Sequence, residues 1–142
     1  VFMDHQLKRV VGYDVQRSPP RLELPSAKRG LLREALLGLA GQRSVDVSVL
    51  SSLMGLWIFG AILNRNLLAI PFHVYHFIEQ YRDNYALLWP SVKAELVAMG
   101  HATVYMYCRL DHKLLPFLFA TDAQGSGEGD FEGYGIVATK LT

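Results

Sequence analysis

Hydrophobic residues recur at the spacing of a helix face through the first third of the chain. From Ser26 to Gly41, leucine and alanine return every three or four positions, which is the period of an α-helix. Serine often caps a helix and glycine often ends one, so we expect the helix to begin with Ser26 and to end at Gly41. The apolar positions are Ala27, Leu31, Leu32, Ala35, Leu36, Leu39 and Ala40.

A longer apolar block runs from Val45 to Leu63. It contains Asp46 and several serines and stops at Asn64, whereas a membrane-spanning helix needs about 20 nearly uninterrupted apolar residues. The block therefore predicts a buried helix. Its core-facing residues are expected to be Val49, Leu50, Leu53, Met54, Trp57 and Ala61.

Two further segments begin with proline, which favours the first turn of a helix. Pro71 opens a third predicted helix, and Pro90 opens a fourth that runs to Gly100. Each segment has an apolar stripe to bury, so residues 26–100 should form a helical bundle. We expect its core to include Leu36, Leu53, Trp57, Phe77 and Leu96.

Strand-like patterns at the two ends of the chain predict β-hairpins. Near the start, β-prone residues from Val10 to Val15 are broken by Ser18-Pro19-Pro20 and followed by Leu22 and Leu24. Near the end, an apolar run through Ala120 is expected to form a buried strand, and a second strand covers Tyr134 to Leu141. Glycines 125, 127 and 129 load the turn between those two strands, and residues 104–110 are extended or irregular. The predicted fold class is α+β.

Asp122 stands where the last apolar run stops, and its role has two interpretations. A strand that presents a carboxylate at its end is one way for a scaffold to position a charged group for chemistry. Aspartate is also a common turn residue, and Asp122 could simply cap the turn.

The 142 residues are 51% hydrophobic and carry a net charge of +1, enough apolar content for a core. Residues 1–43 hold eight Lys and Arg against four Asp and Glu, and residues 44–142 hold six against nine. The basic part indicates a nucleic-acid partner, with an ordinary solvated surface as the alternative. Its candidate phosphate contacts are Arg17 and Arg21 beside the hairpin turn and Lys28, Arg29 and Arg33 on the outer helix face.

The lone Cys108 excludes an internal disulfide and fits an intracellular protein of the cytoplasm or nucleus. The absence of an initiator methionine and of a signal-peptide pattern favours an internal piece of a longer, non-secreted protein. His73 and His76 have a spacing that could bind a metal, but no acidic partner is evident nearby in the sequence.

The run FATDAQGSGEGDFEGYGIVATK resembles the opening of a ribonuclease H domain. That family begins with a strand ending in TDAS or TDGS, then a glycine-bearing turn and a GYG-type strand. Thr121-Asp122-Ala123 and Gly133-Tyr134-Gly135 match, and Gln124 departs from the usual Ser or Gly. The resemblance implies that Asp122 is the first of four acidic residues that hold two divalent ions.

The order of the parts resembles the region that joins polymerase to nuclease in reverse transcriptases of LTR- and DIRS-type retroelements. The run Val11-Gly12-Tyr13-Asp14-Val15 stands where those enzymes have a primer-gripping hairpin that contains Leu-Gly. The run from Leu50 to Trp57 resembles their thumb and connection helix, although Trp57 follows Gly55 by two residues instead of four. Trp89 to Leu96 resembles the helix before the nuclease.

The resemblance implies three parts: the end of a palm-like, primer-grip hairpin (1–25), a thumb- and connection-like helical region (26–112), and two strands of a truncated RNase H-like domain (113–142). It also implies contacts with an RNA–DNA hybrid or template–primer, and Mg²⁺ in the complete nuclease. No membrane partner is expected, because the apolar block from Val45 to Leu63 is interrupted by polar residues. The paired polymerase aspartates do not occur in the sequence, and Asp122 alone cannot hold two ions, so residues 1–142 should be catalytically silent. The alternative is a non-enzymatic helical module that binds nucleic acid or protein.

Overall fold

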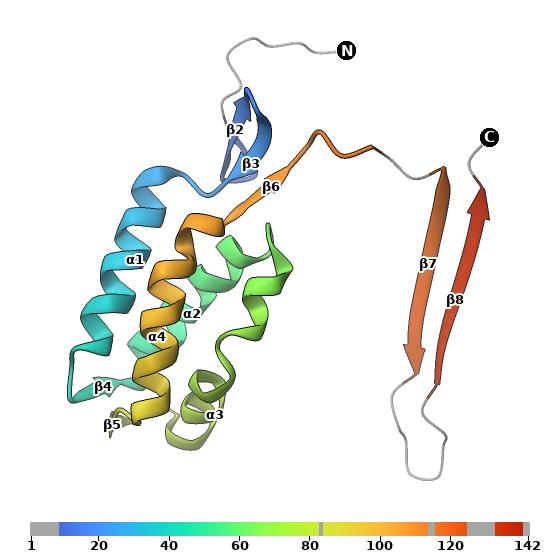
Figure 1. Ribbon diagram of the computed structural model, residues 1–142. Helices are drawn as coiled ribbons and strands as arrows, with labels where there is room; N and C mark the ends of the chain where they lie inside the picture. The colour runs from blue at the N-terminus through green and yellow to red at the C-terminus, as the bar shows by residue number, and fades with distance from the viewer. Residues whose placement is uncertain (1–8, 83, 114–115, 125–132, 141–142) are drawn as a thin grey trace. The chain divides into compact units, whose positions relative to one another are not determined.

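Helices and short antiparallel sheets make up a mixed α and β chain, seen in a computed structural model (Figure 1). The structure describes residues 9–82, 84–113, 116–124 and 133–140, without the side chains of 122–124 and 134. The chain divides into two compact units, residues 1–111 and 112–142. The glycine-rich turn predicted at 125–129 lies outside the described residues.

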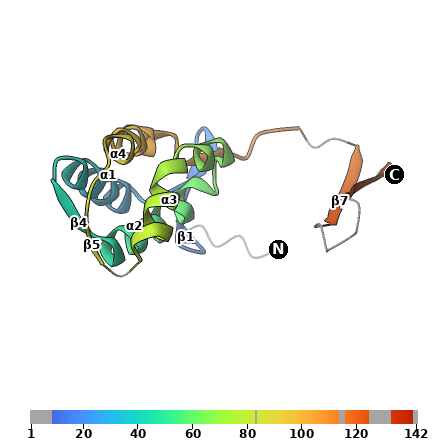
Figure 2. The ribbon, with the colours of Figure 1, turned by 90° about the horizontal axis from the view of Figure 1, so that it is seen from below.

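Four α-helices form the body of the first unit. α1 packs most extensively against α4, which runs antiparallel beside it, and α2 and α3 lie against one side of that pair (Figures 1 and 2). Two 3₁₀ turns follow α2 and α4. The bounds are α1 Ser26–Ala40, α2 Val47–Ala61, η1 Arg65–Ala69, α3 Phe72–Tyr81, α4 Pro90–Ala102 and η2 Thr103–Tyr105.

The core lies between these helices and confirms most of the predicted burial. Leu36, Trp57, Phe77 and Leu96 are all fully buried, as the helical stripes predicted. Leu53 is only half-buried, and Val49, expected to face the core, is 52% exposed. Leu31 on α1 is 67% exposed. The predictions for Leu53 and Val49 were wrong because both residues line a groove where the facing surfaces of α1 and α2 do not close over one another.

A four-stranded antiparallel sheet joins the start of the first unit to its end. The strands are β1 Arg9–Val10, β2 Tyr13–Arg17, β3 Pro20–Glu23 and β6 Tyr107–Arg109, in that order. β2 and β3 form the predicted N-terminal hairpin. β6 pairs with β3 in the segment for which the sequence predicted only extended or irregular structure.

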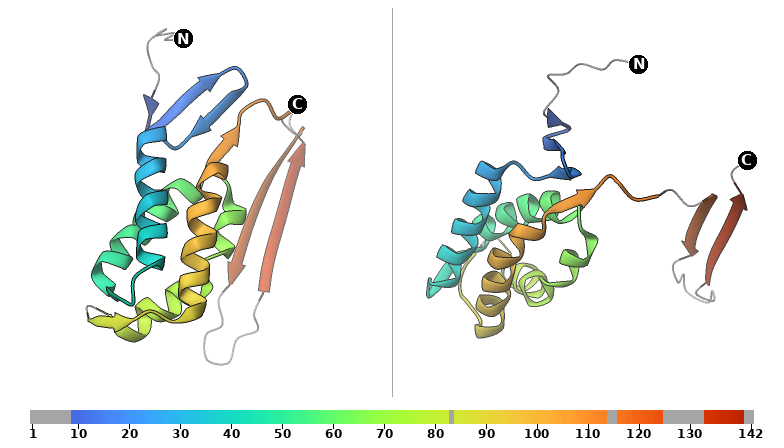
Figure 3. Two further views of the ribbon diagram at one scale, coloured as in Figure 1. Left: turned by 60° about the vertical axis from the view of Figure 1, so that its left-hand side comes forward. Right: turned by 45° about the horizontal axis from the view of Figure 1, so that its top comes forward.

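The contact between β3 and β6 continues into the core. Leu24 N–H donates to the carbonyl of Met106 at 3.2 Å, and both side chains are fully buried. A Cβ on Gly60 of α2 would lie 2.4 Å from Met106 Sδ, so a larger residue there would displace the Met106 side chain. The sheet and the helices therefore share one core, and Figure 3 shows the strands directly above α1 and α4.

The starts of the first two helices differ from each other. The prediction that Ser26 caps α1 was wrong: Ser26 is the first residue of the helix, Pro25 is its N-cap residue, and no side-chain capping hydrogen bond is made there. α2 begins at Val47, after the short strand β4 Ser44–Asp46, so the predicted helical block opens with a strand. Asp46 caps α2 by accepting from Ser48 N–H at 2.9 Å. The hydroxyl and N–H of Ser48 hold the pKa of Asp46 below its ordinary value.

β4 pairs with β5 Tyr85–Leu87 at the lower end of the bundle in Figure 1, burying Val45 against Ala86. Among the helices that the structure describes, none is long and apolar enough to cross a membrane.

The second unit contains one antiparallel hairpin, β7 Phe117–Gln124 and β8 Gly133–Lys140. Asp122 lies opposite Gly135, inside β7 and not at its end, because the strand continues to Gln124. The prediction that the first strand is buried was wrong. Large apolar side chains on both strands are 45–69% exposed: Phe117, Leu118, Phe119, Ile136 and Val137.

Candidate nucleic-acid interface and carboxylate

The tip of the N-terminal hairpin carries backbone strain. Val11 has φ of 49° and Gly12 has φ of 86° in the two-residue turn between β1 and β2. Such turns favour glycine or asparagine, and a β-branched residue in this region is unfavourable. Val11 is also 83% exposed, so no core contact compensates for the strain. Backbone strain of this kind clusters at functional sites.

Aromatic contacts fix this tip to the helices. Tyr13 stacks on Phe59 of α2 with ring centroids 4.5 Å apart, and its hydroxyl donates to the Phe59 carbonyl at 2.6 Å. Burial raises the pKa of Tyr13. Lys28 Nζ of α1 lies 5.7 Å from the centre of the Phe59 ring, within reach of a cation–π attraction. Hairpin, α1 and α2 thus meet at Phe59, a residue that the sequence did not identify.

Two of the predicted basic residues converge on one buried carboxylate. Arg21 Nη2 lies 2.9 Å and Arg29 Nη1 lies 3.9 Å from Glu23 Oε2, while Glu23 Oε1 accepts from Gln16 Nε2 at 2.8 Å. The Oε2 atom makes no well-aligned hydrogen bond, so charge holds it between the two arginines. The Arg21 guanidinium also lies 5.4 Å from the centre of the Tyr107 ring.

The alternation along β3 places Arg21 and Glu23 on one face of the strand, so their pairing could be read from the sequence. The burial of Glu23 could not be read from the sequence, because it depends on a contact with Arg29, which reaches Glu23 from α1.

The other three predicted cations are placed differently. Arg17 is exposed at the end of β2. Arg33 is exposed on α1 together with Lys28. Within the described part of the chain, no ion pair is formed by Lys28 or Arg33. The structure therefore separates the basic set into arginines that share an internal carboxylate and α1 cations that do not.

Asp122 is the predicted metal ligand, and the structure fixes its place in the backbone alone. In the part of the chain that is described, no three His, Cys, Asp or Glu side chains lie close enough to hold a metal ion. One carboxylate does not complete a two-ion site. The described side chains, which do not include that of Asp122, therefore form no site for the magnesium pair that the resemblance implies.

The histidines of α3 have an acidic neighbour that the sequence did not reveal. Glu95 of α4 accepts from the backbone N–H groups of His73 and Val74, each at 2.9 Å, and its Oε1 lies 2.6 Å from His73 Nδ1. Glu95 thus caps the start of α3 from another helix, and His73 belongs to that cap. The contact between His73 and Glu95 is therefore explained by the capping of α3.

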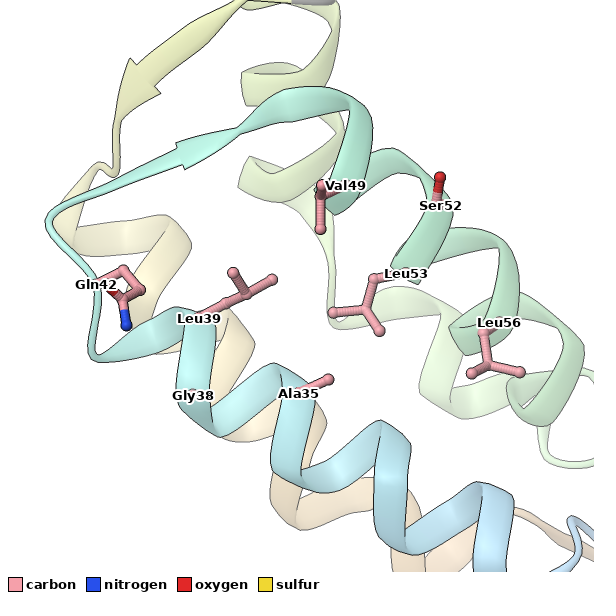
Figure 4. Close-up of a pocket in the computed structure, with 8 residues that line it drawn as sticks. All are labelled: Ala35, Gly38, Leu39, Gln42, Val49, Ser52, Leu53 and Leu56. Carbon is pink, nitrogen blue, oxygen red and sulfur yellow. The ribbon is translucent and has the colours of Figure 1, made fainter.

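An apolar groove of about 550 Å³ separates α1 from α2, where those helices splay apart (Figure 4). Its walls are formed by Ala35, Gly38, Leu39 and Gln42 of the α1 side and by Val49, Ser52, Leu53 and Leu56 of α2. The half-buried Leu53 points into this groove (Figure 4).

The comparisons with known proteins give no relative. No family profile, curated protein or solved structure matches the chain. A function can therefore be argued only from the residues and their geometry.

Proposed function

We propose that the chain is part of a reverse transcriptase with a ribonuclease H, in which residues 1–111 contact a template–primer and residues 112–142 begin the nuclease. The paired strands β7 and β8 carry this proposal. They run antiparallel over eight residues each and place Asp122 opposite Gly135. This hairpin order, with an aspartate in the first strand and a GYG-type second strand, supports an RNase H-like opening.

The exposure of the hairpin supports the same proposal. A two-stranded hairpin is marginally stable by itself in water. Both strands expose large apolar side chains, a pattern that suits strands packed inside a larger sheet. The further acidic ligands for Mg²⁺ would come from that larger domain, supplied by the remainder of a parent polyprotein.

The strained hairpin supports the template–primer contact. In the resemblance to reverse transcriptases, Val11 falls in the primer-gripping hairpin. Its backbone strain and its exposure are typical of a residue held for an external contact. The rings of Tyr13 and Phe59 would hold the turn in position. Lys28 and Arg33 on the adjoining helix would supply phosphate contacts.

The test of the nuclease uses the chain extended natively by about 100 residues, near the lower end of usual domain size. We expect magnesium-dependent cleavage of an RNA–DNA hybrid, and its loss in Asp122→Asn, because the amide has no charge to hold a divalent ion. Residues 1–142 alone should not cleave. If the extended Asp122→Asn protein cleaves as fast as its parent, Asp122 is a turn residue and the nuclease proposal fails.

The test of the nucleic-acid contact measures hybrid binding against salt concentration. Lys28→Ala with Arg33→Ala should flatten the slope of log affinity against log salt by about two units, since each phosphate contact contributes about one. The matched control is Arg43→Ala with Arg82→Ala, which removes the same charge from the other end of the first unit. Equal slopes for the two double variants would contradict the proposed face.

The alternative remains a non-enzymatic helical module that binds nucleic acid or protein. The specific observation in its favour is that, among the described residues, the buried core belongs entirely to the first unit. An extended protein that binds the hybrid with the predicted salt slope and never cleaves it would support the module.

A further inference from the structure

The cluster around Glu23 is not electrically neutral. One carboxylate faces two guanidiniums, so the group carries one excess positive charge. Within the described residues, the Glu23 side chain also accepts a hydrogen bond from Gln16, which is uncharged. An excess charge that is only partly exposed is costly unless an anion neutralises it.

The three charged side chains of the cluster differ in their exposure to solvent. The Glu23 side chain is 9% exposed, whereas those of Arg21 and Arg29 are 35% and 27% exposed. The carboxylate therefore lies within the protein, and each guanidinium is partly exposed to solvent. Arg21 Nε is an exception, because it is buried and has no hydrogen-bond partner among the described residues. Because both guanidiniums are held toward the same oxygen, they stand together at the surface. Neighbouring guanidiniums with one net charge suit a single monoanionic group, such as one phosphodiester.

We infer that Glu23 restrains nucleic-acid binding: it holds Arg21 and Arg29 together as a site for one phosphate and cancels half of their charge. This inference rests on the proposed contact with a template–primer and adds the residue that sets its strength. If the charge of the cluster were fully neutralised inside the protein, neither arginine would be available for binding. Without the Glu23 carboxylate, the two arginines would form a site with twice the net charge. With Glu23 present, the net charge of the cluster and the strength of nucleic-acid binding are intermediate between these two cases.

The first experiment titrates salt against the binding of a labelled RNA–DNA hybrid by the whole 142-residue chain and its Glu23→Gln variant. The amide keeps an oxygen to accept from Gln16 and raises the local charge by one. We expect Glu23→Gln to bind about three- to tenfold more tightly at low salt. The slope of log affinity against log salt should steepen by about one unit.

The matched control is Glu79→Gln, an exposed residue of α3 at the other end of the first unit (Figure 1). It makes the same chemical change and the same change in net charge. Its slope should equal that of the unaltered chain. If Glu23→Gln folds and binds no more tightly than Glu79→Gln, the inference is overturned while the proposed contact stands.

A second variant keeps the inference testable if Glu23→Gln does not fold. Arg29→Gln removes the excess charge and leaves the 2.9 Å pair of Arg21 with Glu23. We expect its slope to be shallower by about one unit, with unchanged thermal stability, because its own contact to Glu23 is long at 3.9 Å. An unchanged slope overturns the inference. Absence of salt-dependent binding by the unaltered chain overturns the proposed contact and this inference together.

Discussion

The first unit and the C-terminal hairpin are both rich in apolar residues but use them in opposite ways. In the first unit, Trp57 and Phe77 are fully buried by helices from distant parts of the sequence. In the hairpin, Phe119 is 54% exposed and Ile136 is 62% exposed. Both regions have regular backbone hydrogen bonds, so secondary structure alone does not distinguish them. What differs is whether an apolar face has a complementary face to meet.

The largest expected effect contrasts one side chain from each region. Trp57→Ala should lower the free energy of unfolding by about 3–5 kcal/mol, because it leaves a large cavity in the core. Ile136→Ala should change it by less than about 0.5 kcal/mol, since that side chain is already in solvent. Denaturant unfolding followed by far-UV circular dichroism measures both. Similar losses in the two variants would mean that the hairpin supports the first unit.

A smaller effect should come from polar groups that the first unit satisfies internally. Glu95→Ala removes the acceptor of two N–H groups in the first turn of α3, and we expect a loss of about 1–3 kcal/mol. The control is Glu79→Ala on the exposed face of α3, which should stay within about 0.5 kcal/mol. The midpoints of denaturant unfolding give the comparison. If the two midpoints agree, the cap supplied by α4 adds nothing beyond what water supplies.

The smallest effect concerns pH and the cap of α2. The pKa of Asp46 is lowered from its ordinary 3.8, first by the Ser48 hydroxyl and then by the Ser48 N–H. Its charged form therefore stabilises the fold above that ordinary pKa, and this contribution disappears as pH falls through the lowered value. Asp46→Asn keeps a side-chain acceptor but does not titrate. Its melting temperature should fall less than that of the parent between about pH 4 and pH 2. Parallel curves would show that the carboxylate charge is irrelevant to the cap.

Local periodicity predicted most of the first unit. The stripes of α1 to α4 placed Leu36 and Leu96 correctly, because a helix face depends only on spacing of three and four residues. The same stripes misplaced Leu53, since periodicity gives the direction of a face and not the distance of its neighbour. β4 and β5 have three residues each, too few for an alternation to be recognised.

The candidate site was predictable in its residue types and only partly in its arrangement. Arg21 and Arg29 were expected to face phosphates, but their shared carboxylate depends on a contact between β3 and α1 that no local pattern encodes. Asp122 was expected at the end of a strand and lies within it. Its register opposite Gly135 is set by the hairpin itself.

The pairing of β3 with β6 has a consequence for synthesis of the chain on the ribosome. Within the first unit, the N-terminal hairpin and α1 are made before α2 and α3, and their partners β6 and α4 are made after them. The apolar surfaces of the N-terminal hairpin and α1 cannot be fully buried until β6 and α4 have been made, so the nascent chain exposes apolar surface during that interval. A chaperone that holds the first helices during translation would act in this interval, and a stalled chain that stops before Tyr107 would remain open.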